Sequence, residues 1–238
     1  MTAVVLEFTG ISKDYRGLRP LRIADLTIAA GEHVAILGFD QFSAEVFVNL
    51  ATGATLPDAG EVRVLGRPTS AITDSADWLA TVDRFGIVSE RAVLLDQLTV
   101  IQNLALPFTL DIEPPPADVQ ALAEGLARET GLPEDSWARP VADLDANGRA
   151  RLRLGRAIAL DPAVLLLEHV SASVSRDGVA ELGSDLREIA RRRGAALVAA
   201  TADEAFARAV AGRVLTLEPS SGRLRESRRG RWLGGRLG

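Results

Sequence analysis

Residues 31–45, which read GEHVAILGFDQFSAE, determine the expected fold. The apolar run from His33 to Leu37 predicts a buried strand that ends at Gly38. The apolar stretch from Val46 to Leu50 predicts a helix, and Glu45 would then complement the helix dipole from the first turn. A buried strand that passes through a glycine turn into a helix is a building unit of α/β folds.

The rest of the chain repeats this alternation of apolar strands and helical stretches. Strands are expected at 4–11, 21–28, 60–66, 85–89, 163–167, 195–200 and 213–217. Helices are expected at 78–85, at 119–129 and over most of 98–186. Strands that alternate with helices predict an α/β fold with a largely parallel central sheet.

Composition narrows the class of protein. The chain has 238 residues, of which 47% are hydrophobic and 25% charged, as in a soluble globular protein. No apolar run approaches the ~20 residues that span a bilayer, and residues 1–11 do not resemble a secretion signal, so we expect a cytoplasmic protein. The absence of cysteine excludes disulfides and thiolate metal sites, and a net charge of -5 argues against a nucleic-acid binder.

The turn after the first buried strand stands where a phosphate-binding loop would follow the pattern G-x-x-x-x-G-K-[ST]. In residues 38–45, called here the 38–45 loop, Gly38 fits this pattern. Ser43 replaces the second glycine, Ala44 the lysine and Glu45 the hydroxyl that binds Mg²⁺. The lost lysine removes a charge pair of about 4 kcal/mol at an effective dielectric of ~20. We therefore expect weak binding of any polyphosphate.

Several segments keep a common order and spacing: 31–38, 49–53, PDAGEV at 57–62, LTVIQNLALP at 98–107, 151–162 and 165–167. In this order they resemble the ATP-binding subunits of ABC transporters over nearly the whole chain. The resemblance implies a P-loop NTPase-like ABC ATPase fold, with a largely parallel central sheet, an antiparallel β edge and a helical subdomain. It places the core at about 1–90 and 160–222, the helical subdomain at about 91–159, and an Arg/Gly-rich tail at 223–238.

Each functional motif of that family is altered in this chain. The signature LSGGQ, which contacts the nucleotide of the opposite subunit, reads Leu144, Asp145, Ala146, Asn147 and Gly148. The glutamine that senses Mg²⁺ and water is replaced by Glu90, the catalytic glutamate by His169, and the switch histidine by Ala202. Glu168 takes the place of the metal-binding aspartate. Phosphoryl transfer depends on positioning and charge stabilisation, so we expect no hydrolysis.

Little else in the chain favours a ligand. Tyr15 stands where the family stacks an aromatic ring on adenine, which contributes about 1–3 kcal/mol. This is too little to hold ATP on its own, so a partly buried turn aromatic is an equal alternative. We expect no cofactor, with ATP and Mg²⁺ bound only if the altered site still accepts them. No metal site is expected, since the chain has only two histidines.

The surface that receives the membrane permease in this family is better preserved. The resemblance assigns docking to Glu90, Leu94, Leu95, Leu98, Val100 and Asn103. It implies a pseudo-ATPase subunit that docks a permease on the inner face of the cell membrane and pairs with a second nucleotide-binding subunit, as a homo- or heterodimer. Two alternatives remain: a divergent but active ATPase, and a scaffold or regulator that is independent of nucleotide.

Basic residues gather at the end of the chain. They are Arg223, Arg225, Arg228, Arg229, Arg231 and Arg236, with Trp232 and Leu233 among them. We expect a solvated chain end, because termini are usually poorly ordered. The alternative is an adhesive patch for anionic lipid or an acidic partner.

Overall fold

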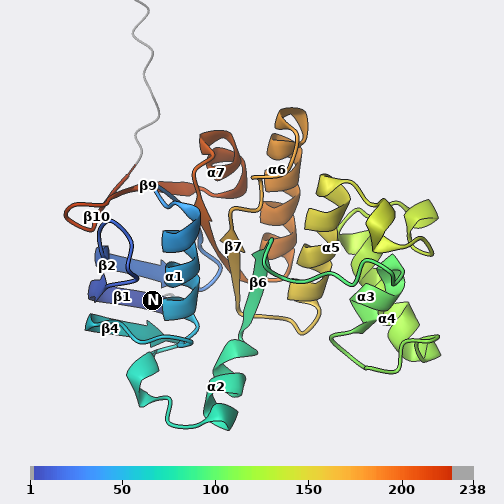
Figure 1. Ribbon diagram of the computed structural model, residues 1–238, viewed down its shortest axis with the longest axis horizontal. Coiled ribbons are helices and arrows are strands. Elements are labelled where there is room, and N and C mark those ends of the chain that lie inside the picture. Colours follow the sequence, from blue (N-terminus) through green and yellow to red (C-terminus); the bar gives the residue numbers. More distant parts are fainter. Residues whose placement is uncertain (1–2, 227–238) are drawn as a thin grey trace, which may run out of the picture.

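The computed structural model describes residues 3–226, and its centre is a six-stranded sheet in the order β10-β9-β3-β8-β7-β6 (Figure 1). Its strands are β3 (His33–Leu37), β6 (Phe85–Ser89), β7 (Val164–Glu168), β8 (Ala196–Thr201), β9 (Arg213–Glu218) and β10 (Arg223–Glu226). The strands from β9 to β6 run parallel, and β10 pairs antiparallel with β9. The predicted α/β fold with a largely parallel central sheet is confirmed.

A second, antiparallel sheet has the order β2-β1-β4-β5. Its strands are β1 (Val4–Lys13), β2 (Leu21–Ala29), β4 (Ala59–Val64) and β5 (Arg67–Pro68). Helix α1 (Gln41–Ala51) packs on this sheet, where the rings of Phe8 and Phe47 stack with centroids 5.0 Å apart. The antiparallel edge expected from the resemblance is therefore present.

The central sheet is buried on both faces, and alternate residues of its strands enter two different cores. Val34 and Ile36 of β3 pack with α1 and the antiparallel sheet, whereas Ala35 packs with the helices of the opposite face. The helices are α2 (Ser75–Val82), α3 (Val100–Ala105), α4 (Ala117–Glu129), α5 (Ala146–Ile158), α6 (Arg176–Arg192) and α7 (Glu204–Val210). The alternation follows from the two-residue period of a strand.

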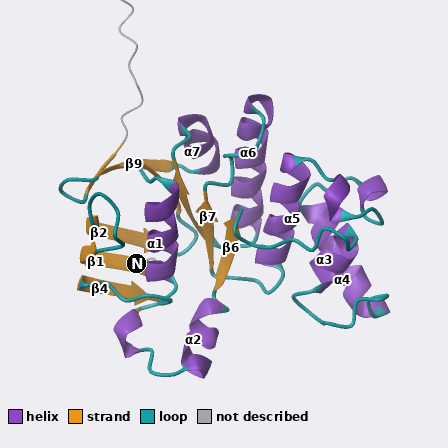
Figure 2. Ribbon diagram, in the orientation of Figure 1, coloured by secondary structure: helices purple, strands orange, loops and turns teal. Residues whose placement is uncertain are grey.

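Helices α3, α4 and α5 form a group to one side of the central sheet (Figures 1 and 2). Helix α5 joins this group to the sheet by packing on β6. A Cβ at Gly86 of β6 would lie 2.4 Å from the carbonyl oxygen of Ala157, so the close approach of α5 requires glycine. No helix in residues 3–226 has the length and apolar character needed to cross a membrane.

Three local expectations differ from the structure. Helix α1 begins at Gln41, with Asp40 as its N-cap, so Glu45 lies beyond the first turn and does not complement the helix end. Helix α2 starts at Ser75 and stops at Val82, earlier than predicted. Arg223 and Arg225 belong to β10, because backbone pairing with β9 orders the segment that was expected to begin a loose tail. The other basic residues of the tail, with Trp232 and Leu233, lie outside the described residues.

Candidate functional site

The 38–45 loop connects β3 to α1 and provides its own anion. The backbone at Gly38 has φ 100°, and a Cβ there would lie 2.9 Å from the carbonyl oxygen of Leu217, so only glycine fits. The Asp40 carboxylate accepts hydrogen bonds from the Ser43 backbone N–H and from the Ser43 hydroxyl, both at 2.7 Å. The Ser43 hydroxyl also accepts from the Asp40 backbone N–H at 3.0 Å, which completes a capping box.

These bonds place a carboxylate at the N-terminus of α1. The N-terminus of a helix attracts anions through its free N–H groups and its dipole. Here the hydrogen bonds from Ser43, backbone first and then side chain, lower the pKa of Asp40 and keep its carboxylate charged. Ala44, at the position of the phosphate-binding lysine, is fully buried. The loop therefore carries a charged carboxylate at Asp40 and no cation at position 44.

Arg91, in the loop after β6, pairs with carboxylates at the end of β7 and on α1. Its guanidinium donates to both carboxylate oxygens of Glu168, from Nε at 2.9 Å and from Nη2 at 2.6 Å. Its Nη1 atom lies 3.0 Å from Oε1 of Glu45. The hydrogen bonds to Glu168 are the main cause of the raised pKa of Arg91, which keeps the guanidinium charged. A side chain of the chain itself thus neutralises two carboxylates that could otherwise attract a cation.

Three of the expected catalytic positions come together beside this ion pair. Glu90, Glu168 and His169 line a cavity of about 120 Å³. Ligand pockets for small molecules usually enclose about 300–1,000 Å³, so this cavity is too small for a nucleotide. Ala202, which follows β8, is not among the lining residues. Within residues 3–226, no group of three or more His, Cys, Asp or Glu side chains could hold a metal ion.

His169 has an unusual place in this cavity. It follows β7 with φ 46°, in the left-handed region that non-glycine residues rarely adopt, and its Nε2 atom is buried without a hydrogen-bond partner. It lines this cavity together with Gln41 of the 38–45 loop. Its side chain has no hydrogen-bonded acceptor in the described residues that would orient it as a base.

Tyr15 lies next to the 38–45 loop, on the side of β1 and β2. Its ring is partly buried and packs against the core around α1. Burial first, and then the nearby charge of Asp40, raises the pKa of its phenol. The position agrees with either a turn aromatic or a base-stacking ring, so both interpretations of Tyr15 stay open.

The signature segment, residues 144–148, lies at the start of α5 in the helical group. Asp145 is the N-cap of α5, and its Oδ1 atom accepts from the Gly148 N–H at 2.7 Å. Leu144, Ala146 and Asn147 complete the segment, and the buried Oδ1 of Asn147 has no hydrogen-bond partner. As in the 38–45 loop, an aspartate of the chain itself caps the start of the helix.

Replacing Asp145 tests this capping role. Asp145→Ala is expected to lower the free energy of unfolding by about 1 kcal/mol, because α5 loses its N-cap. Asp145→Asn keeps an acceptor oxygen and should unfold close to the wild-type chain. Urea denaturation of the three proteins measures both values. Equal stability of the alanine and wild-type chains would contradict the role.

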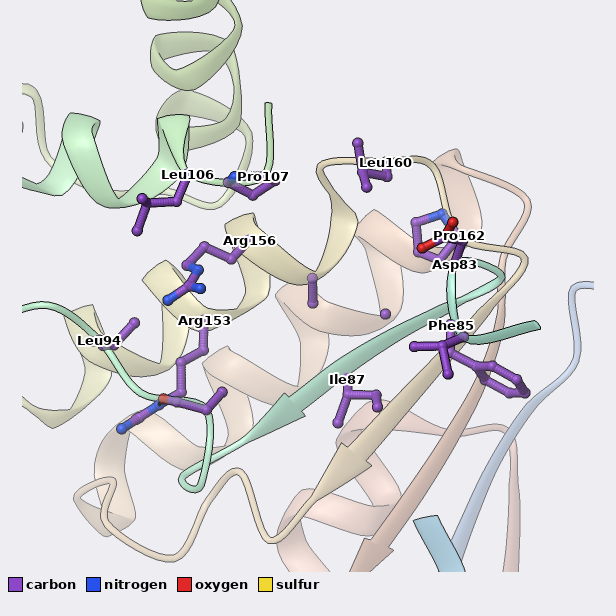
Figure 3. Close-up of a pocket in the computed structure, with 14 residues that line it drawn as sticks. Asp83, Phe85, Ile87, Leu94, Leu106, Pro107, Arg153, Arg156, Leu160 and Pro162 are labelled. Carbon is purple, nitrogen blue, oxygen red and sulfur yellow. Dashed lines mark hydrogen bonds between the residues drawn. The ribbon is translucent and has the colours of Figure 1, made fainter. Parts of the chain in front are cut away.

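A groove of about 360 Å³ lies where α5 meets β6, on the edge of the central sheet. Figure 3 shows Arg153 and Arg156 of α5 between the segment carrying Leu94 and the segment carrying Leu106 and Pro107. Phe85, Ile87 and Leu160 line the groove as well. The groove lined by these residues is called the α5 groove below.

The α5 groove changes the set of residues expected to dock a permease. Of the predicted residues, Leu94 lines the groove, and Glu90 and Leu95 are exposed beside it. Leu98 is partly buried. Val100 and Asn103 are 0% exposed, so they cannot present a docking surface. Asn103 instead bonds the Leu95 N–H and carbonyl at 2.9 and 3.0 Å, which anchors the preceding loop.

Comparison with curated proteins identifies the family. A LolD ATP-binding protein of a lipoprotein-releasing system from Maricaulis maris is 31% identical over 205 residues, which are 84% of this chain and 89% of that protein. The chain belongs to the family of ABC transporter ATP-binding subunits. A methionine import ATP-binding protein, MetN from Leifsonia xyli, is 29% identical over 91% of this chain. The matched region spans only 64% of the length of that relative. No protein-family profile matches the chain.

Solved ABC cassettes share the fold. CbiO1 from Clostridium perfringens, part of the CbiONQ transporter complex, superposes with a TM-score of 0.78 at 20% identity, over 94% of this chain and 87% of CbiO1. The cassette MJ0796, solved as a dimer bound to ADP and Pi, superposes with a TM-score of 0.76 at 20% identity, over 94% of this chain and all of MJ0796. The ABC ATPase fold expected from the sequence is confirmed.

Asp40 and Arg91, both central to this ABC-family site, were not among the residues predicted from the sequence. Asp40 and Ser43 stand three residues apart before an apolar stretch, which is an N-cap pattern that could have indicated the capping box. Arg91 had no comparable signal, because 77 positions separate it from Glu168. Only the parallel pairing of β6 with β7 brings the loop after Ser89 beside Glu168.

Proposed function

We propose that this ABC-family chain is a pseudo-ATPase subunit, which contributes a docking surface and a dimer partner to a transport system but does not itself bind or hydrolyse ATP. Its proposed division has a core at about 1–90 and 160–222 and a helical subdomain at about 91–159. Its proposed position is the inner face of the cell membrane, in contact with a permease.

The observation that carries this proposal is the internal occupation of the nucleotide site. The Asp40 carboxylate bonds the N–H at the start of α1, and the Arg91 guanidinium bonds both oxygens of Glu168. MgATP would have to displace the Asp40 carboxylate from the N–H at the start of α1 and the Arg91 guanidinium from Glu168. It would do so without the lysine that usually holds its phosphates, since Ala44 stands there.

The signature segment extends this proposal to the partner subunit. Family members pair head to tail, so residues 144–148 would face the nucleotide of a second subunit. With Asp145 bound to the Gly148 N–H, this end of α5 offers a carboxylate to a phosphate. We therefore propose that the chain supports its partner by position and not by contributing to the partner's hydrolysis.

Calorimetry with MgATP tests the proposal directly. The purified wild-type chain is expected to show no binding tighter than roughly 1 mM, which corresponds to about -4.1 kcal/mol. No phosphate release should be detectable in the same solutions. Micromolar binding with hydrolysis would overturn the proposal in favour of a divergent ATPase. An absence of any permease among the proteins that associate with the chain would instead favour a scaffold.

A further inference from the structure

We infer that the α5 groove receives an acidic segment: an apolar helix or loop of the membrane partner with an Asp or Glu that pairs with Arg156 and Arg153. The inference rests on the proposed function, because it specifies the chemistry of the partner at that docking surface. It goes further in naming the residues that select the partner.

Helix α5 carries four arginines, and two of them have no carboxylate partner in the part of the chain that the structure describes. Arg149 pairs with Asp96 at 2.8 Å, and Arg151 pairs with Asp185 at 2.6 Å. Arg153 and Arg156, which face the groove, have no carboxylate within 4.0 Å in the part of the chain that the structure describes. The helix therefore places its two unpaired cations on one surface.

Both groove arginines are held by backbone carbonyls and are partly removed from water. Nη1 of Arg156 donates to the Val93 carbonyl at 2.6 Å, and Nε of Arg153 donates to the Ala92 carbonyl at 3.3 Å. Burial lowers the pKa of both guanidiniums, and for Arg156 no nearby carboxylate opposes that effect. A partly desolvated cation is stabilised by an anion that enters with its own hydrogen-bonding oxygens.

The rest of the groove is suited to a protein segment. Most of its lining is apolar, including Leu94, Leu106, Pro107 and Leu160, and Leu160 is 57% exposed. Asp83 is the one carboxylate among the lining residues, and in Figure 3 it lies beside Pro162, away from the two arginines. An occupant with apolar side chains and one or two carboxylates would bury the exposed leucine and pair the arginines together.

Photo-crosslinking locates the occupant. The full chain carrying p-benzoylphenylalanine in place of Leu160 is irradiated in membranes of its source cell, and the linked segment is identified by mass spectrometry. The same label in place of Leu122, which is 53% exposed on α4 and is not among the groove residues, is the matched control. We expect Leu160, and not Leu122, to capture a loop of an integral membrane protein that contains Asp or Glu.

Binding of a synthetic peptide with the captured sequence then tests the charge. Replacing its Asp or Glu by Asn or Gln should weaken binding to the wild-type chain at least about tenfold. The double variant Arg153→Gln/Arg156→Gln should weaken binding of the acidic peptide by a similar factor and leave binding of the neutral peptide unchanged. Arg149→Gln, a matched change outside the groove, should have no effect. The variant Arg156→Lys keeps the charge and should bind the acidic peptide almost as well as the wild-type chain. Thermal unfolding of each variant checks that its fold is retained.

Each result separates the inference from the function on which it rests. A captured membrane loop whose affinity does not depend on its carboxylates would overturn the inference and leave the docking function intact. A lack of any membrane protein captured from Leu160 above the Leu122 level would overturn both. A captured acidic loop would support both if its binding is weakened by neutralising its carboxylate and also by the Arg153→Gln/Arg156→Gln change.

Discussion

Restoring the phosphate-binding pattern in the 38–45 loop is expected to tighten MgATP binding at least about 100-fold over the wild-type chain. The variant carries Asp40→Ser, Ser43→Gly, Ala44→Lys and Glu45→Ser. It removes the carboxylate that caps α1 and adds the missing cation. A close charge pair is worth about 4 kcal/mol at an effective dielectric of ~20, and about 2.8 kcal/mol of that value is enough for a 100-fold change.

A variant with only Ala44→Lys and Glu45→Ser is the matched control. It keeps the capping box of Asp40 and Ser43, so the α1 N–H groups stay occupied. We expect it to bind MgATP at least about tenfold more weakly than the four-residue variant. Calorimetry on both proteins gives the comparison. Equal affinities would show that the Asp40 cap does not exclude phosphate, and no binding by either would show that the loop residues are not what closes the site.

Neither variant is expected to hydrolyse ATP. His169 still stands at the position of the catalytic glutamate, and Ala202 at that of the switch histidine. Under the proposed function, binding and hydrolysis respond to different changes, since binding depends on the loop and hydrolysis on the ends of β7 and β8.

Arg91→Met is expected to lower the free energy of unfolding by about 2 kcal/mol. Glu168 is 3% exposed and would be left as a buried carboxylate without its partner. Removing one member of a buried pair costs about 3–5 kcal/mol, and we reduce this because the Arg91 side chain is 38% exposed. Methionine keeps the apolar stem, so the loss reports on the charge and its hydrogen bonds.

A double-mutant cycle separates the ion pair from packing. Arg91→Met/Glu168→Leu removes both charges, and we expect it to recover at least about half of the stability lost by Arg91→Met. Glu45→Gln removes the more exposed partner and should cost less than about 1 kcal/mol. Urea denaturation of the wild-type chain, of the single variants Arg91→Met, Glu168→Leu and Glu45→Gln, and of the double variant measures each value. A double variant as unstable as the sum of its single changes would show that Arg91 and Glu168 do not act as a pair.

The elements of the fold could be predicted from local patterns with small errors. The run from His33 to Leu37 is strand β3, as the sequence predicted, because a continuous apolar run of this length fits a strand that is buried on both faces. The start of α1 was placed too late, because Asp40 was not considered as an N-cap. Strand β10 was missed because its sequence is polar and basic, and only the edge of the sheet at β9 gives it a partner.

The positions of the candidate site stay predictions from the sequence, whereas its interactions are known only from the structure. The sequence located the 38–45 loop, the signature segment and the residues Glu90, Glu168 and His169. The sequence did not indicate that Val100 and Asn103 are fully buried, because both fall in a segment that resembles the family only in its amino-acid sequence. Burial depends on the packing of α3 against α4 and α5, which no single segment contains.

The sequence by itself determined that this chain has the alternating strands and helices of an ABC cassette and carries Ala44, His169 and Ala202 where the family pattern has a lysine, a glutamate and a histidine. These properties depend on local composition, such as an apolar run or the absence of a lysine at Ala44. The tertiary structure alone decided what replaces the lost ligands. Arg91 meets Glu45 and Glu168 only after α1, β6 and β7 pack together, because an ion pair depends on distance in space and not on separation along the chain.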